Sequence, residues 1–131
     1  MKMPEQVVNL LNDKEATKVL TTVSAEGIPH SVVVGSTMAP EADLICAAEV
    51  LMQSTSKNLQ VNKTVSVLAV KGMESYQVVA KVKERQTEGP LFEAAKAELE
   101  KLGLPCRGLW LFEPLEAFDQ GAGANAGKKI A

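Results

Sequence analysis

Two short stretches near the start of the chain are dominated by apolar and β-branched residues, a composition typical of strands. They run from Thr17 to Ser24 and from Ile28 to Gly35, with Ala25-Glu26-Gly27 between them. Glycine adopts the positive φ of a tight turn without steric cost, so the pattern predicts a β-hairpin. Before the hairpin, the segment Pro4–Lys14 has its apolar residues on one stripe and is predicted to form a short amphipathic helix.

Four more strands and two more helices are predicted downstream. The strands are Leu44–Ala48, Val65–Val70, Ser75–Thr87 and Gly108–Phe112, with an extension of the last strand to Phe118 left open at Pro114. Residues 38–43 are predicted to form a turn. One helix is opened by the polar residues 52–58 and ends near Asn62. The other starts at Gly89-Pro90, buries Phe92, Ala95, Leu99 and Leu102, and ends at Gly103.

Apolar and polar residues alternate within Ser75–Thr87. The alternation places Lys81, Lys83 and Arg85 on one face of the strand, which is therefore predicted to be wet. Six strands joined mostly by tight turns, with three short helices, predict a mainly β fold: an antiparallel barrel with appended helices, because closure removes exposed strand edges. Periodicity does not distinguish OB-like, SH3-like and split barrels from one another.

Composition limits the function classes. A chain of 131 residues, 46% of them hydrophobic and 23% charged, is expected to form a single domain. No stretch approaches the roughly 18 apolar residues of a membrane span, and the start lacks the layout of a signal peptide, so we expect a cytoplasmic protein without membrane contact. A net charge of -2 with one Trp, one Tyr and three Phe argues against nucleic acid as a partner.

The cysteines and the histidine give little sign of a metal or catalytic centre. Cys46 and Cys106 form no CxxC pair, and a single histidine cannot complete a zinc site with them, so we expect no metal. Both thiols are expected to be buried and reduced. His30 has no Asp, Ser or Cys at a spacing that indicates a triad, and we assign it no catalytic role.

The stretch MQSTSKN, Met52 to Asn58, contains more hydrogen-bonding side chains than a turn needs. It follows a predicted strand and opens a predicted helix. Backbone N–H groups at a helix start have no internal partner and lie at the positive end of the helix dipole, so Ser54, Thr55 and Ser56 are candidates for binding a phosphate. The alternative is that one serine caps the helix and no ligand is involved.

At this point the chain resembles a known family. The order of TKVLTTVSAEGIPHSVVV, a third strand, a polar helix start, NLQVNKTVSVLAV and a lysine-alternating strand is similar to that of the FMN-binding split-barrel proteins related to pyridoxamine 5'-phosphate oxidase. The resemblance covers residues 18–85, and it implies a six-stranded antiparallel split barrel with FMN as the cofactor. It also implies a homodimer with the flavin at the subunit interface.

The resemblance implies two groups of cofactor contacts. The strand residues Val33, Val34, Gly35 and Ser36 would lie along the isoalloxazine and ribityl chain, although both valines are equally expected in the core. The phosphate contacts would come from Ser54 and Thr55, with Ser56, Lys57 and Asn58 completing that corner. Many family members have Lys or Arg where this chain has Ser54, so Lys57, or Lys128 and Lys129 of the tail, are expected to supply the positive charge.

Two further features have two interpretations each. Trp110 either packs in the core or approaches the flavin at a subunit interface, and core packing is favoured. The Gly-rich end, residues 120–131, lacks the order of a phosphate-binding P-loop; it either wraps over the barrel or frays.

The function expected from these features is that of an FMN-binding oxidoreductase or electron-transfer protein. The flavin would supply the redox chemistry, and no protein nucleophile is expected. Pyridoxamine 5'-phosphate oxidase activity itself is not expected, because the chain is short and shows no Arg-His substrate clamp near its end. The alternative is a non-catalytic carrier or sensor that binds flavin, deazaflavin or haem.

Overall fold

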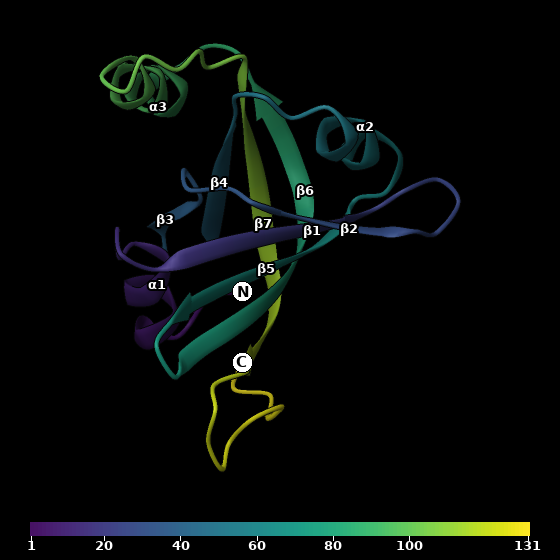
Figure 1. Cartoon of the computed structure of the whole chain (residues 1–131), viewed down its shortest axis with the longest axis vertical. Coiled ribbons are helices and arrows are strands. Elements are labelled where there is room, and N and C mark those ends of the chain that lie inside the picture. The colour runs from purple at the N-terminus through teal and green to yellow at the C-terminus, as the bar shows by residue number, and fades with distance from the viewer.

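The computed structural model describes residues 1–131, which form one seven-stranded antiparallel sheet with three helices (Figure 1). The strand order is β2-β1-β5-β6-β7-β4-β3. The helices are α1 (Glu5–Leu11), α2 (Ser54–Val61) and α3 (Pro90–Glu100). The strands are β1 (Thr17–Val23), β2 (Pro29–Val33), β3 (Met38–Glu41), β4 (Leu44–Glu49), β5 (Thr64–Lys71), β6 (Glu74–Gln86) and β7 (Gly108–Asp119).

The main core lies inside the curled sheet and contains 19 buried residues. The strands β1 and β5 contribute every second residue, such as Leu20 and Val67, which are fully buried. The helix α1 adds Val7, Leu10 and Leu11, and α2 adds Leu59. The prediction of a mainly β fold with appended helices is therefore confirmed, and none of the helices is long and apolar enough to cross a membrane.

The sheet has seven strands, not six, because the predicted turn at Met38–Asp43 is wrong. Met38–Glu41 forms the edge strand β3, which pairs with β4. The side chain of Asn12 takes the place of a neighbouring strand: its Nδ2 donates to Ala39 O (2.9 Å) and its Oδ1 accepts from Ala39 N (2.8 Å). The pairing of β3 shifts register between its two ends, which removes the regular alternation by which a strand is predicted.

A second register shift changes the prediction for β6. Between Val82 and Glu84 the pairing with β7 slips by one residue, so Arg85 pairs with Trp110. A β-bulge of this kind reverses which face the following side chains point to. The prediction that Arg85 lies on the same face as Lys81 and Lys83 is therefore wrong: its side chain stays 36% exposed, but its guanidinium reaches the buried Glu49.

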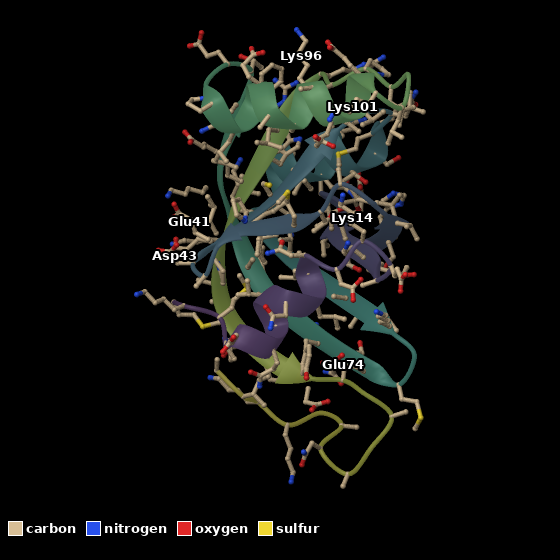
Figure 2. All side chains as sticks on the ribbon, turned by 90° about the vertical axis from the view of Figure 1, so that its left-hand side faces the viewer. Lys14, Glu41, Asp43, Glu74, Lys96 and Lys101 are labelled. Atoms are coloured by element: carbon tan, nitrogen blue, oxygen red, sulfur yellow. The ribbon has the colours of Figure 1, made fainter.

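The helix α3 covers a smaller second core on the other side of β4 and β7. Its Phe92 and Leu99 pack there with Cys46 and Leu109. Figure 2 shows Lys96 on the side of α3 that faces away from the sheet, as an amphipathic helix requires. Leu102, which we predicted to be buried, is 73% exposed because the helix ends at Glu100.

The Gly-rich tail is folded back onto the end of β7, where Ile130 N donates to Ala117 O (2.8 Å). An isolated bridge also joins Lys129 to Phe118. The tail lies at the end of the molecule opposite to α2 (Figure 1), and Lys129 pairs with Glu116 (3.2 Å). The interpretation of a frayed terminus is therefore wrong, and within one chain Lys128 and Lys129 supply no charge to α2.

The two free cysteines should differ in reactivity. Cys46 is 4% exposed and burial raises its pKa to about 11. Burial also raises the pKa of Cys106, but this side chain is only partly buried and a reagent can reach it. Because thiolates are the reactive species, we expect a disulfide reagent to label Cys106 well before Cys46 in folded protein, and both at similar rates in urea. Folded Cys106→Ser should give almost no early labelling. Equal rapid labelling of both thiols in the folded wild type would contradict this packing.

Candidate functional site

The first turn of α2 presents three backbone N–H groups with no acceptor in the chain. The first helical hydrogen bond runs from Lys57 N to Gln53 O (3.1 Å), so the N–H groups of Ser54, Thr55 and Ser56 precede it and are free. Gln53 is the N-cap residue and its side chain makes no capping bond. The alternative in which a serine caps the helix is therefore wrong. Free N–H groups at the positive end of a helix dipole suit an anion.

Of the side chains predicted to hold a phosphate, some make no hydrogen bond or ion pair within the chain and others are already hydrogen-bonded. Ser54 is exposed and Thr55 is 2% exposed, and neither side chain makes a hydrogen bond within the chain. Lys57 is exposed and forms no ion pair. Asn58 is buried and donates from Nδ2 to Thr22 Oγ1 (3.0 Å), which fastens α2 to β1. Ser56 Oγ donates to Glu49 Oε1 (2.6 Å).

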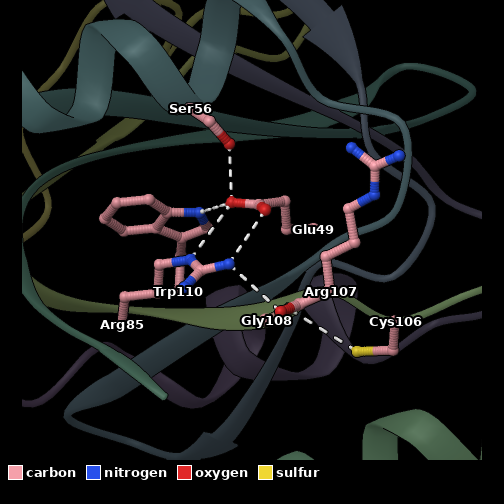
Figure 3. Close-up of polar contacts among 7 residues, drawn as sticks. All are labelled: Glu49, Ser56, Arg85, Cys106, Arg107, Gly108 and Trp110. Atoms are coloured by element: carbon pink, nitrogen blue, oxygen red, sulfur yellow. Dashed lines mark hydrogen bonds and ion pairs between the residues drawn. The ribbon is translucent and has the colours of Figure 1, made fainter. Parts of the chain in front are cut away.

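Glu49, the last residue of β4, is the centre of a polar cluster that the sequence did not predict (Figure 3). Its Oε1 accepts from Ser56, from Trp110 Nε1 (2.9 Å) and from Arg85 Nε (3.2 Å). Its Oε2 accepts from Arg85 Nη2 (3.0 Å). One carboxylate thereby joins β4, α2, β6 and β7, and the Glu49 residue is only 8% exposed.

Hydrogen bonding keeps Glu49 ionised. Burial by itself raises the pKa of the Glu49 carboxyl, but the hydrogen bonds from Arg85, Ser56 and Trp110 and the charge of Arg85 outweigh that effect. The pKa of Glu49 therefore lies below its ordinary value. The site contains a buried carboxylate whose charge is balanced by one guanidinium.

Arg85 is held in place from several sides. Its Nη2 also donates to Arg107 O (3.1 Å), and its Cζ lies 6.0 Å from the centre of the Trp110 ring. A Cβ on Gly108 would lie 2.8 Å from the guanidinium and would displace it, so glycine leaves the space for this position of Arg85. The side chain of Arg107 itself forms no ion pair and is drawn apart from the Glu49 carboxylate in Figure 3. The Arg107 backbone N–H donates to Glu49 O (2.8 Å), and Lys57 directly follows Ser56. Arg107 and Lys57 are therefore two unpaired positive charges that belong to segments of this cluster.

Trp110 lies in the main core and is 4% exposed. The favoured prediction of core packing is confirmed, and its indole N–H is already bound to Glu49. Contact of Trp110 with a cofactor stays a prediction.

The strand residues predicted to lie along the flavin do not share one face. Val33 is 65% exposed, whereas Val34 is buried in the main core. Gly35 is exposed, and Ser36 Oγ accepts the N–H of Ala48 (3.0 Å). The two groups of predicted contacts are nevertheless near each other, because α2 packs on β1 and β2. Their roles as cofactor contacts stay predictions.

Sequence reasoning missed Glu49 and Arg85 for a physical reason. Glu49 ends an otherwise apolar strand, and a buried carboxylate needs a partner that lies 36 residues away in the chain. Pairs at that separation leave no periodic signal. The one available indication was an acidic residue directly after the apolar run Leu44–Ala48, because charged residues are rarely buried without a partner.

Comparisons with known proteins give the family. Residues 3–119 match the family model described as pyridoxamine 5'-phosphate oxidase, and no curated protein matches the chain. HupZ of Group A Streptococcus is 25% identical, with 95% of this chain and 99% of that chain covered and a TM-score of 0.79. An FMN-binding protein from Syntrophomonas wolfei is 17% identical, with 88% and 84% covered and a TM-score of 0.82. An F420 reductase is 14% identical, with 88% and 98% covered and a TM-score of 0.68.

The curled antiparallel sheet with its appended helices is a split barrel, which confirms the predicted class apart from the strand count. The family model spans most of the 131 residues, and the chain belongs to the pyridoxamine 5'-phosphate oxidase family. The resemblance seen in residues 18–85 is thereby confirmed and extends over nearly the whole chain.

The Glu49 cluster should make stability depend on pH. A carboxyl whose folded pKa is lowered stabilises the protein fully above its ordinary pKa of about 4.3, and that contribution is lost as the pH falls through the lower folded value. We expect the melting temperature of the wild type to fall steeply between about pH 5 and pH 3. The melting temperature of Glu49→Gln should fall less over the same pH range. Parallel melting curves for the two proteins would show that Glu49 does not contribute.

Proposed function

We propose that the protein binds FMN, with the phosphate at the start of α2. The observation that carries this proposal is the set of free N–H groups at Ser54, Thr55 and Ser56, to which the unbonded hydroxyls of Ser54 and Thr55 add two more donors. This donor set fits a phosphate monoester, for which neutral N–H and O–H groups at a helix start are suited. When bound, FMN supplies hydride or single-electron transfer, and the chain supplies anchoring and orientation.

Two fixed contacts hold the donors in place. The Asn58–Thr22 bond ties the middle of α2 to β1, and the Ser56–Glu49 bond ties its first turn to β4. A donor set that is ordered before the ligand arrives loses less conformational entropy on binding. Lys57 and Arg107 supply unpaired positive charge for the phosphate.

The strand β2 supports the same placement. Thr22, which binds Asn58, pairs with His30 of β2, and Val33 lies three residues further along that strand. At about 3.3 Å per residue, His30 and Val33 are about 10 Å apart, a distance that an elongated ligand spans. The exposed Val33 and the backbone of Gly35 are therefore candidate contacts for the distal part of the ligand.

The proposal includes a homodimer in the cytoplasm. The outward residues Val19 and Leu68 of β1 and β5 are only partly exposed and belong to neither core. They line a hollow of about 370 Å³ together with polar side chains of β2, β5 and β6. No residue of α2 lines this hollow, so a second chain on this face is the simplest way to enclose a ligand that reaches from α2.

Removing the two free hydroxyls tests the anion site. We expect Ser54→Ala combined with Thr55→Val to weaken FMN binding roughly tenfold or more, since hydrogen bonds to charged groups contribute about 1.5–3 kcal/mol each. The change is measured by titrating apoprotein into FMN and following flavin fluorescence. Thr55 is 2% exposed and its hydroxyl makes no hydrogen bond within the chain, so valine leaves no partner unsatisfied and the melting temperature should change little.

A matched control removes two exposed hydroxyls elsewhere, with Thr17→Ala and Thr64→Ala. FMN binding should then stay at the wild-type level. Native-level binding by the α2 variant would refute the anion site. A native mass and a visible spectrum of purified protein distinguish FMN from a deazaflavin or haem, and oxidation of a reduced nicotinamide tests for turnover.

The dimer has its own test. We expect the wild type to elute with the mass of two chains in size-exclusion chromatography with light scattering. Val19→Glu with Leu68→Glu should give a folded monomer that binds FMN more weakly, because buried charges at an interface need partners. Leu102→Glu, at a residue that is 73% exposed, is the control and should remain dimeric. A monomeric wild type would refute this part of the proposal.

A further inference from the structure

Glu49 places a negative charge beside the proposed phosphate site. Its Oε1 lies 2.6 Å from Ser56 Oγ, in the first turn of α2. The single hydroxyl proton of Ser56 is donated to that carboxylate, so Ser56 has none left for a phosphate. The chain therefore provides an internal anion that competes with any bound anion for the same helix start.

Arg85 compensates this charge and is fixed while doing so. Its Nε and Nη2 both bind the Glu49 carboxylate, and Nη2 also binds Arg107 O. The guanidinium is planar, so in this two-point contact its remaining nitrogen points away from the carboxylate. Glu49 thus lies between Ser56 and Arg85 (Figure 3), and Arg85 does not extend a free nitrogen past Glu49 toward the helix start.

We propose that Arg85 is a positioning residue that permits an anion to bind at α2 by neutralising and holding Glu49, without touching the anion itself. The proposal rests on the phosphate site proposed above. Without Arg85, the carboxylate would keep an uncompensated charge within reach of the ligand phosphate, and like charges at short range in a partly buried site repel strongly. Without the charge of Glu49, an anion would bind at α2 without the help of Arg85.

A double-mutant cycle separates this indirect role from direct contact. FMN affinity is measured by calorimetry for the wild type, Arg85→Gln, Glu49→Gln and the double variant. We expect Arg85→Gln to bind at least about tenfold more weakly, and Glu49→Gln to bind severalfold more tightly than the wild type. The double variant should bind within about threefold of Glu49→Gln. A double variant as weak as Arg85→Gln would show that Arg85 contacts the ligand and would overturn the proposal.

Lys81→Gln is the matched control. It removes a charge of the same sign from β6, where Lys81 pairs with Glu113 (3.4 Å) and both side chains are about half exposed. FMN affinity should not change in this variant, because exposed pairs are screened by solvent. Trp110 is the only tryptophan in the chain and donates to Glu49, so its fluorescence reports whether the cluster is intact in each folded variant.

The outcomes also distinguish this proposal from the FMN assignment. The same cycle is run with inorganic pyrophosphate as a second anionic probe. A wild type that binds pyrophosphate but not FMN refutes the cofactor and leaves the cycle to decide the role of Arg85. A wild type that binds neither probe overturns both proposals. If Arg85→Gln does not fold, Glu49→Gln decides alone, and unchanged or weaker affinity in that variant overturns the role of Arg85.

Discussion

The structure depends most on one buried carboxylate. Glu49 accepts hydrogen bonds from residues of α2, β6 and β7, and so fixes the helix that carries the candidate site to the long strands of the barrel. Transfer of a carboxylate from water costs several kcal/mol, and here four hydrogen bonds and a guanidinium offset that cost. An ion pair with a buried acid is weak evidence for net stability, because apolar residues of similar volume often stabilise as well as a buried pair does. The Glu49 cluster instead fixes the position of the first turn of α2, through the hydrogen bond from Ser56.

The geometry of β6 and β7 makes this pair attainable. A strand with unbroken alternation would place Arg85 on the outer face with Lys81, where its charge would be solvated. The register shift after Val82 turns Arg85 to the side of Trp110, where its side chain is still 36% exposed, and Gly108 leaves room for the guanidinium against β7. The bulge and the glycine are backbone features, yet their effect is electrostatic: they bring a cation to the only buried acid in the chain. Fold and charge are therefore coupled at this end of the barrel.

Sequence predicted the parts of the protein that local interactions determine. The hairpin, the amphipathic helices and the start of α2 follow from β-branched runs, 3.6-residue periodicity and a cluster of short polar side chains, all of which act within a few residues. The strand β3 was missed because its pairing with β4 shifts register, and the side chain that bonds its outer edge, Asn12, lies 27 residues away from Ala39. Ser56 was assigned to the phosphate because its competitor, Glu49, becomes its neighbour only when β4 and α2 fold together. Tertiary pairing, rather than propensity, decided each of these cases.

The division between free and engaged donors follows from these constraints. An anion site at a helix start needs unbonded N–H groups, but a helix start left entirely free would be poorly ordered. In this chain Ser56 and Asn58 anchor α2 through their side chains, which leaves the backbone N–H groups and the hydroxyls of Ser54 and Thr55 unbonded. The partner that anchors Ser56 is the acceptor Glu49, and a charged carboxylate makes a stronger hydrogen bond than a neutral acceptor. A carboxylate beside an anion site in turn requires a cation, so the presence of Arg85 follows from the way α2 is anchored.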